Sequence, residues 1–184
     1  MKITAKLLPA LVLALGATAW GAESTVGAVV DDAALTAKVK TALVQNPSTK
    51  AHQIDVDTQN GVVQLNGFVE SADARVAAES TARTIDGVRS VDNNLEVRPG
   101  DRSVGGTIDD AAISAKVKAA MLVDSRTKAY QVDVKTSQGT VVLGGFVATP
   151  AEKSAAQELA GSVEGVTQVQ NNIVVDRSKS PAAK

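Results

Sequence analysis

The chain has 184 residues, of which 19 are basic and 20 acidic, and it contains no cysteine. Such a balance of charge gives no general affinity for nucleic acid or for an anionic membrane, so any contact of that kind must come from a local patch. Without cysteine the chain forms no disulfide, and its folding does not depend on a redox compartment. Only 2% of the residues are aromatic, so Ala, Val, Leu and Ile must build the hydrophobic core.

Residues 1–22 are typical of a cleaved secretory signal peptide. A short basic segment, MKITAK, precedes the apolar run LLPALVLALGATA, which is shorter than the ~20 residues that a membrane-spanning helix needs. Small residues suited to cleavage lie between Ala19 and Ala22, and no cysteine follows for attachment of a lipid. We therefore expect an exported, periplasmic protein. Loss of Lys2 and Lys6 from the 19 basic residues leaves 17 against 20 acidic ones, a net charge of −3.

Most of the remaining chain is an internal repeat. Residues 31–98 align with residues 109–176 without a gap, and nearly half of the aligned positions are identical. Two copies are fewer than the three or more that a solenoid needs, so the repeat indicates two tandem domains. The segment between them is rich in Gly and Ser and is typical of a flexible linker. The expected boundaries are a first domain at 30–98, a linker at 99–107, a second domain at 108–176 and a disordered tail at 177–184.

Each repeat begins with a predicted amphipathic helix. Asp31 and Asp32 are acids at its expected N-terminus, where they would cap free N–H groups and meet the positive end of the helix dipole. Apolar residues then recur at helical spacing. The two stripes are Leu35, Val39, Ala42 and Leu43 in the first copy, and Ile113, Val117, Ala120 and Met121 in the second.

A hairpin follows. Asn60-Gly61 is a strong signal for a two-residue turn, and the second copy has the weaker Gln138-Gly139. With these turns, alternate residues share one inward face: Ile54, Val56, Val63 and Leu65, and likewise Val132, Val134, Val141 and Leu143. Gly67 and Gly145 continue that face, which suggests a bulge or the close approach of a helix. Phe68 and Phe146 fall on the other face by strict alternation, so either a bulge turns them inward or they are exposed apolar anchors.

A second helix and a last strand complete each repeat. The helix runs from Ser71 to a glycine C-cap at Gly87 in the first copy, and Gly165 is the corresponding residue of the second. The strand contains a pair of asparagines, which we interpret as a bulge or turn, with a polar ligand as the alternative. The order helix–strand–strand–helix–strand predicts an α+β fold of two small αββαβ domains. Each should be a three-stranded mixed sheet with both helices on one face.

These residues carry a resemblance to a known family. Gly67, Gly87-Val88 and the closing VDNNLEV segment, each present twice, are similar to the BON-domain family. A signal peptide followed by two such domains resembles the periplasmic members of that family. The resemblance implies a role in osmotic or envelope stress, with association to phospholipid proposed for the domain and a chaperone-like role as an alternative.

The sequence offers little for catalysis. His52 is the single histidine and its repeat counterpart is Tyr130, so a metal cluster or a catalytic histidine is not expected. Asp55 and Asp133 match each other but should point outward, apart from other repeated acids. We therefore expect no enzyme, no cofactor and no metal, and a chain that is a monomer.

Four lysines remain as candidate binding residues: Lys38, Lys40, Lys116 and Lys118. Lys38 should lie roughly opposite the apolar stripe of its helix and Lys40 on a flank, so both are either an ordinary solvated face or a surface for phosphate. Phospholipid binding would need Lys116 and Lys118 to lie beside an exposed apolar residue, because the net charge offers no long-range attraction. Without such a residue, the alternative is a periplasmic chaperone or protein-interaction module that binds unfolded or folded proteins and has no lipid affinity. Asn60, Gly61, Gly67, Gly87, Gly139, Gly145 and Gly165 are assigned to turns and packing.

Overall fold

The computed structural model describes residues 25–49, 53–98 and 104–179, and it contains two domains of the same design. The expected signal peptide and His52 lie outside these residues. The first domain consists of α1 (Thr25–Gln45), β1 (Ile54–Gln59), β2 (Val62–Val69), α2 (Ala72–Arg83) and β3 (Ser90–Val97). The second consists of α3 (Val104–Val123), a 3-10 turn η2 (Ala129–Gln131), β4 (Val132–Ser137), β5 (Thr140–Val147), α4 (Pro150–Gly161), β6 (Gln168–Asn171) and β7 (Val174–Val175), followed by η3 (Arg177–Lys179).

Both sheets are mixed, which confirms the predicted α+β class. In the first sheet the order is β1-β2-β3, with β1 antiparallel and β3 parallel to the central strand β2. The hairpin register pairs Val56 with Leu65 and Thr58 with Val63, as a two-residue turn requires. The second sheet repeats this order, but its last strand is interrupted at Asn172-Ile173, so β6 and β7 both pair with β5. The second sheet thus has four strand segments instead of the three expected.

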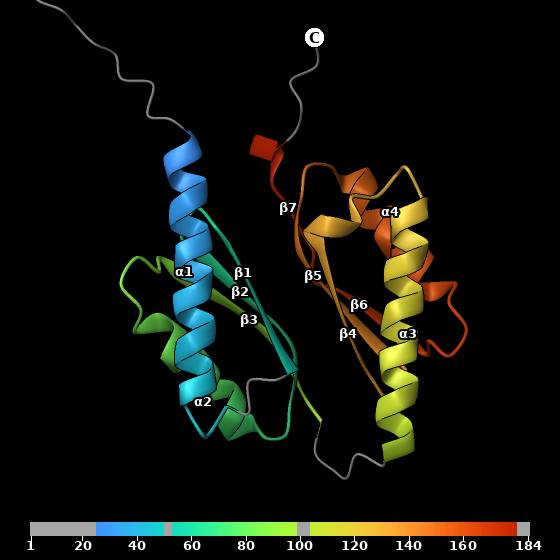
Figure 1. Ribbon diagram of the computed structural model, residues 1–184, viewed down its shortest axis with the longest axis horizontal. Coiled ribbons are helices and arrows are strands. Elements are labelled where there is room, and N and C mark those ends of the chain that lie inside the picture. Colours follow the sequence, from blue (N-terminus) through green and yellow to red (C-terminus); the bar gives the residue numbers. More distant parts are fainter. Residues whose placement is uncertain (1–24, 50–52, 99–103, 180–184) are drawn as a thin grey trace, which may run out of the picture.

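The two helices of each domain cover one face of its sheet and leave the other face open to the neighbouring domain. Figure 1 shows α1 and α2 outside one sheet, α3 and α4 outside the other, and the two sheets side by side at the centre. The core of each domain lies between helices and sheet. It contains Val39, Leu43, Val63, Leu65 and Leu95 in the first domain, and Val117, Met121, Val141, Leu143 and Ile173 in the second.

The first helix of each domain begins earlier than its pair of acids. α1 starts at Thr25 and α3 at Val104, so residues 104–107, assigned above to the linker, are helical. The Asp32 carboxylate accepts hydrogen bonds from the backbone N–H groups of Asn60 and Gly61, at 2.6 and 2.9 Å. The expected N-terminal cap was therefore wrong. The two N–H groups of the hairpin turn have no strand partner, and this acid satisfies them instead.

The second domain repeats that contact. Asp110 accepts from the N–H groups of Gln138 and Gly139, at 2.9 and 3.1 Å. Gln138 has a φ of 51°, the value of Asn60, although glutamine rarely adopts a left-handed conformation. The carboxylate thus accompanies the same turn in both hairpins.

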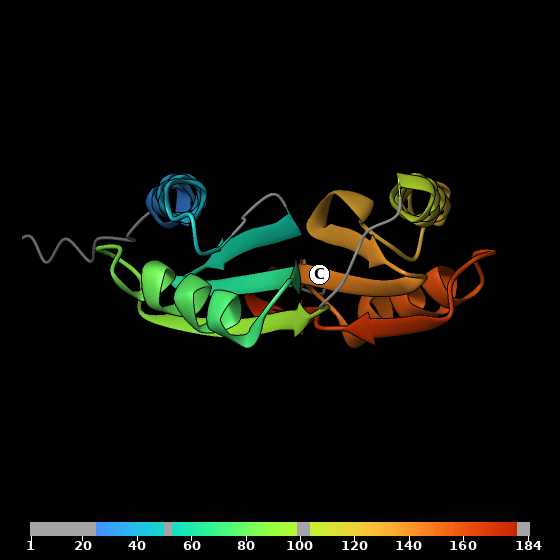
Figure 2. The same cartoon turned by 90° about the horizontal axis from the view of Figure 1, so that it is seen from below.

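The two domains dock through the open faces of their sheets. In Figure 2, which is turned by 90°, the strands of both domains meet at the centre while α1 and α3 stay apart. Gln64 on β2 makes hydrogen bonds to Gly145 N and Asn172 O of the second domain, each 3.0 Å long. Lys135 on β4 forms an ion pair with Asp55 on β1 at 3.2 Å. Hydrogen bonds and an ion pair therefore join the two domains.

Phe68 and Phe146 lie on the outer faces of their sheets, as strict alternation of β2 and β5 requires. Phe68 is 1% exposed, yet it belongs to neither helix-covered core. The guanidinium of Arg98 covers its ring at 5.7 Å from the ring centre, and the same guanidinium donates to Thr140 Oγ1 of the second domain at 2.9 Å. Both alternatives offered by the sequence are thus wrong: no bulge turns these residues inward, and they are not exposed anchors. These aromatic residues are buried because their face of the sheet is covered, not because the strand turns over.

Candidate functional site

A pocket recurs where the first helix of each domain meets the hairpin turn. In the first domain it measures about 450 Å³ and is lined by Asp32, Lys38, Gly61, Gly87 and Arg89, among others. The equivalent pocket of the second domain measures about 500 Å³ and includes Asp110, Lys116, Gly139 and Gly165. Because the acid in each pocket already accepts two turn N–H groups, its carboxylate is engaged in holding the fold.

The lysines of the first helices lie on the two flanks of the buried stripe. Lys38 and Lys116 border the pockets just described, so Lys38 does not lie opposite the stripe. Lys40 and Lys118 follow by two residues, about 200° further around the helix, and occupy the other flank. All four lysines are exposed.

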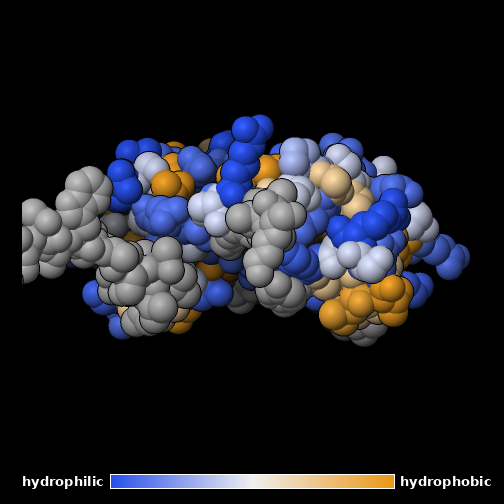
Figure 3. Space-filling model, turned by 90° about the horizontal axis from the view of Figure 1, so that it is seen from above, coloured by the Kyte–Doolittle hydropathy of each residue, from blue (hydrophilic) through white to orange (hydrophobic). Residues whose placement is uncertain are grey.

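The exposed face between Lys116 and Lys118 is entirely apolar. Its residues are Ala111, Ala112, Ala115, Ala119, Leu122 and Val123. Leu122 and Val123 at the C-terminal end of α3 are 73% and 88% exposed, although they are large hydrophobic side chains. In Figure 3 an orange patch marks this end of α3. We call these six residues the α3 apolar face.

The corresponding face of α1 is more polar. Its residues are Ala33, Ala34, Ala37, Thr41, Val44 and Gln45, so Thr41 replaces Ala119 and Gln45 replaces Val123. Val44 is 73% exposed, like its equivalent Leu122. Of the two first helices, α3 therefore presents the larger apolar surface, a difference that the sequence analysis did not single out although the aligned repeats contain it.

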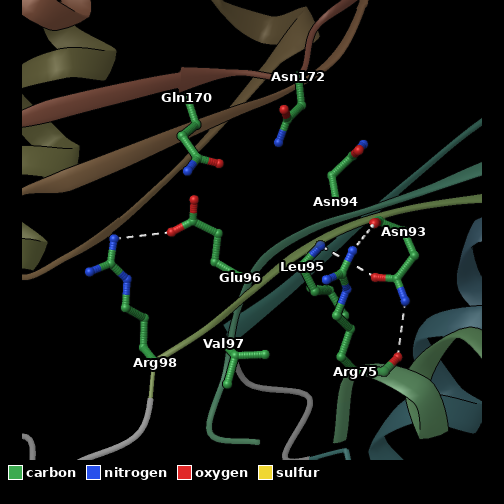
Figure 4. Close-up of a pocket in the computed structure, with 9 residues that line it drawn as sticks. All are labelled: Arg75, Asn93, Asn94, Leu95, Glu96, Val97, Arg98, Gln170 and Asn172. Carbon is green, nitrogen blue, oxygen red and sulfur yellow. Dashed lines mark hydrogen bonds and ion pairs between the residues drawn. The ribbon is translucent and has the colours of Figure 1, made fainter. Parts of the chain in front are cut away.

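A third pocket lies between the domains. It measures about 490 Å³ and is lined by Arg75, Asn93, Asn94, Glu96, Arg98, Gln170 and Asn172, together with Leu95 and Val97. Figure 4 shows that Asn94 and Asn172, which are equivalent residues of the two repeats, extend toward each other across it. Arg98 is held by Glu96 at 3.0 Å and Arg75 donates to Asn93 O at 3.3 Å, so both guanidinium groups are engaged within the protein.

The asparagine pairs divide their tasks. Asn93 donates to Arg75 O and Glu79 Oε2, at 3.0 and 3.1 Å, and so ties β3 to α2. Asn171 does the same in the second domain, with Lys153 O at 2.9 Å. The first residue of each pair therefore joins helix to strand, whereas both second residues, Asn94 and Asn172, line the interdomain pocket, where Asn93 also contributes. This separation depends on contacts between elements, which is why the sequence did not reveal it.

Carboxylates from the two domains meet at the interface. Burial, followed by the charge of Asp133 on β4, raises the pKa of Asp57 on β1. The expectation that Asp133 points away from other acids was wrong, because docking brings the outer faces of β1 and β4 together. The sequence did contain a sign of this interface. Strand alternation places Asp55, Asp57 and Phe68 on the same outer face of the first sheet.

The described residues contain no group of three His, Cys, Asp or Glu side chains placed to hold a metal ion. Among the helices of the described ranges, none is long and apolar enough to cross a membrane. Within this part of the chain, the arrangement provides surfaces for binding: the α3 apolar face, the repeated turn pockets and the polar interdomain pocket.

Two αββαβ units joined in tandem, each with the same acid-bound hairpin turn, define a duplicated α+β protein. The BON domain model matches residues 31–99 and 109–177, and the chain therefore belongs to the BON-domain family, with two copies of the domain. The resemblance noted from the paired glycines and the VDNNLEV segment is confirmed.

The chain is similar to several proteins of known name. It is 40% identical over 149 residues to osmotically-inducible protein Y of Escherichia coli (strain K12), covering 80% of this chain and 74% of that protein. It is 34% identical over 146 residues to the outer membrane lipoprotein DolP of Haemophilus influenzae, covering 79% and 75%. It is also 34% identical over 145 residues to a 21 kDa hemolysin of Actinobacillus pleuropneumoniae, covering 78% and 73%.

A solved structure, the C-terminal domain of the type III secretion protein CdsD of Chlamydia trachomatis, aligns with 77% of this chain and 97% of its own length. The TM-score is 0.34 and the sequence identity 12%. Such a likeness carries no statement about function.

Proposed function

We propose that this protein is a non-enzymatic binding protein of the bacterial periplasm that serves the osmotic or envelope stress response and contacts membrane phospholipid through α3. The observation that carries the proposal is the exposure of Leu122 and Val123 between the flanks of Lys116 and Lys118. This is the combination of basic and apolar residues that lipid contact requires in a chain without net positive charge.

The order of residues along α3 fits an interfacial helix. Leu122 follows Lys118 by one turn, and Val123 follows Lys116 by two turns, so each apolar side chain lies in line with a lysine. On a membrane surface the apolar pair would enter the boundary of the acyl chains while the lysines meet headgroup phosphates. Each lysine near an anionic surface contributes about 1 kcal/mol, so the association is expected to be weak and sensitive to salt.

The relatives support the cellular setting. One is named as osmotically inducible and another as an outer membrane lipoprotein. The expected signal peptide at residues 1–22 fits export of this chain to the bacterial envelope. The polar side chains of the interface also support a binding role. Gln64, Arg98 and Asp55 are bonded to the other domain, so they are engaged in docking and not in catalysis.

Co-sedimentation with liposomes tests the proposal. The mature chain should pellet with vesicles containing anionic phospholipid at low salt, and less so at 0.15 M salt, where the screening length is about 8 Å. Leu122→Gln combined with Val123→Gln, and separately Lys116→Ala with Lys118→Ala, should each reduce pelleting severalfold. Because all four side chains are exposed, neither pair of substitutions should lower the melting temperature appreciably.

The matched control is the equivalent change on α1. Lys38→Ala with Lys40→Ala should leave most of the pelleting intact, because α1 has the more polar face. If the substitutions on α1 and α3 reduced pelleting equally, the assignment of the contact to α3 would be wrong. If the wild type did not pellet at low salt, the protein would not bind phospholipid as proposed. If the wild type does not pellet but suppresses aggregation of an unfolded client, the chaperone alternative is supported instead.

A further inference from the structure

The two domains dock about an approximate twofold axis, so equivalent residues of the repeats face each other across the interface. Asn66 and Gly144 are equivalent residues, and the side chain of Asn66 fills the space beside Gly144. Asn94 and Asn172 are also equivalent, and they extend toward each other (Figure 4). These positions lie on the axis. In a twofold arrangement, each contact away from the axis has a counterpart in which the two partners exchange roles.

The pockets beside the interface follow the same symmetry. The interdomain pocket joins Arg98 after β3 to Gln170 on β6. A smaller pocket of about 230 Å³ joins Asp92 on β3 to Asp176 after β7. Asp92 is the equivalent of Gln170, and Asp176 is the equivalent of Arg98. The docked chain is therefore built like a symmetric dimer of one domain, made from two copies that differ in sequence.

The charges at the interface differ between the two copies. Asp55 forms its ion pair with Lys135 at 3.2 Å, and their equivalents in the other repeat are Asp133 and Asp57. The first domain therefore has two acids at these positions, whereas the second has an acid and a base. Two second domains placed about the same axis would set Asp133 of each copy opposite Lys135 of the other. Such a pair would contain two ion pairs, whereas two first domains would oppose only acids.

The residues near the axis favour the same pairing. Two first domains would place Asn66 against Asn66, and even an added Cβ at Gly144 would collide with this side chain. Two second domains would place glycine against glycine. Val142, the equivalent of Gln64, is 1% exposed although it is not part of the helix-covered core. Docking therefore covers this apolar side chain already, and a second copy of the domain would cover it too.

We propose that the outer sheet face of the second domain is self-complementary and binds the same face of a second copy of this chain. Within one chain, the first domain occupies that face. Gln64 secures it with hydrogen bonds to Gly145 N and Asn172 O, each 3.0 Å long. A domain attached by a short linker also acts at an effective concentration on the order of millimolar. The intact chain is therefore a monomer, and release of the first domain allows two chains to associate.

Self-pairing would bring two copies of α3 to one side of the assembly. In the docked chain α1 and α3 lie on the same side of the sheets (Figure 2), and the axis would place a second α3 where α1 lies. If the α3 apolar face binds lipid as proposed above, the paired chains present it twice. The experiments below measure association in solution without lipid, so they hold or fail independently of lipid binding.

An undocking variant, Gln64→Ala combined with Asn66→Arg, tests the proposal in the full chain. It removes two hydrogen bonds to the second domain, and the longer arginine collides beside Gly144. Neither residue belongs to the helix-covered core, so circular dichroism should show both domains folded. In sedimentation velocity the wild type should remain a monomer, whereas the variant should form a dimer whose share rises with concentration.

Spin labels identify the surface that pairs, because the chain contains no native cysteine. Ala37 on α1 and Ala115 on α3 are equivalent, exposed positions. In the undocking variant, a single label at Ala115→Cys should give a distance between chains that matches the distance from position 37 to position 115 within the wild type. The same axis relates both pairs of positions. A single label at Ala37→Cys should give no such distance.

Further substitutions in the undocking variant test the chemistry of the face. Lys135→Asp replaces the two expected ion pairs by opposed acids, and Gly144→Val places two valines on the axis. Each should return the variant to a monomer. Asp86→Asn, at an exposed acid of the first domain, is the control and should leave the dimer unchanged.

Three results would overturn the proposal. An undocking variant that stays monomeric would show that the free face does not pair with itself. A dimer that survives Lys135→Asp or Gly144→Val would use another surface. A narrow, wild-type distance between labels at positions 37 and 115 in the undocking variant would show that these residues do not decide which faces pair.

Discussion

At the scale of single residues, Gly67 and Gly145 lie against the backbone of the residue that precedes the neighbouring strand, β1 or β4. Gly67 has a φ of +117° and Gly145 a φ of +110°. A Cβ atom at either position would collide with a backbone carbonyl, that of Gln53 or Gln131. The sequence predicted a bulge or the approach of a helix at these glycines. The approaching group is the segment that leads into the first strand of the same hairpin, and at Gly145 this segment is the 3-10 turn η2, which ends at Gln131.

Gly67→Ala should therefore destabilise the first domain. The left-handed φ alone costs about 1–3 kcal/mol for a residue with a Cβ, and the collision with a backbone atom cannot be relieved by a rotamer change. Urea denaturation should show a lower midpoint for Gly67→Ala. Gly161→Ala is the control, because the nearest atom to its added Cβ is 3.9 Å away and alanine favours the helix. Equal midpoints for the two variants would contradict this account.

At the scale of elements, α1 and α3 have nearly the same buried stripe but different exposed faces. The buried positions are determined by packing on the sheet, and helical periodicity predicted them in both repeats. The exposed positions are not constrained by packing, so their divergence is informative about binding. The α3 apolar face is interrupted in α1 at two positions, Thr41 and Gln45.

Restoring the apolar residues on α1 should create a second lipid contact. Thr41→Ala with Gln45→Val makes this face of α1 fully apolar, with Val44 in place of Leu122 as the one remaining difference from α3, and Lys38 and Lys40 are already present. If the α3 apolar face binds lipid for the reasons given, the doubly substituted chain should pellet with anionic liposomes more strongly than the wild type, since two linked contacts reinforce each other. Unchanged pelleting would mean that the identity of these exposed residues does not determine lipid affinity.

At the scale of the whole molecule, the differences between the repeats make the two domains complementary. Gln64 and Asn66 on β2 correspond to Val142 and Gly144 on β5. Gln64 reaches across to the second domain, and Asn66 occupies the space left by the missing side chain of Gly144. Two identical domains would not offer this pairing of a polar side chain with a vacant position.

Gly144→Val should separate the domains without unfolding them. The added side chain would collide with Asn66, whereas the backbone of Gly144 has no positive φ and accepts any residue in a strand. With Ala37 on α1 and Ala115 on α3 changed to cysteine to carry spin labels, the distribution of distances between the two labels should broaden, and the thermal unfolding of each domain should persist. Val142→Ala, on the same face but without a collision, is the control. A narrow distribution in Gly144→Val would show that docking does not depend on this fit.

The α+β class, the αββαβ order, the hairpin register and the helix-facing cores follow from the sequence itself, because they depend on local periodicity, turn residues and the repeat. The tertiary structure decided what each outward residue contacts. Alternation placed Asp55, Asp57 and Phe68 on the outer face, but only docking brought Asp133, Lys135 and Arg98 to them. Contacts between domains join residues far apart in the chain, and no local pattern encodes which open faces meet. The acid of the first helix was misassigned for the same reason: its partner was a turn 28 residues away.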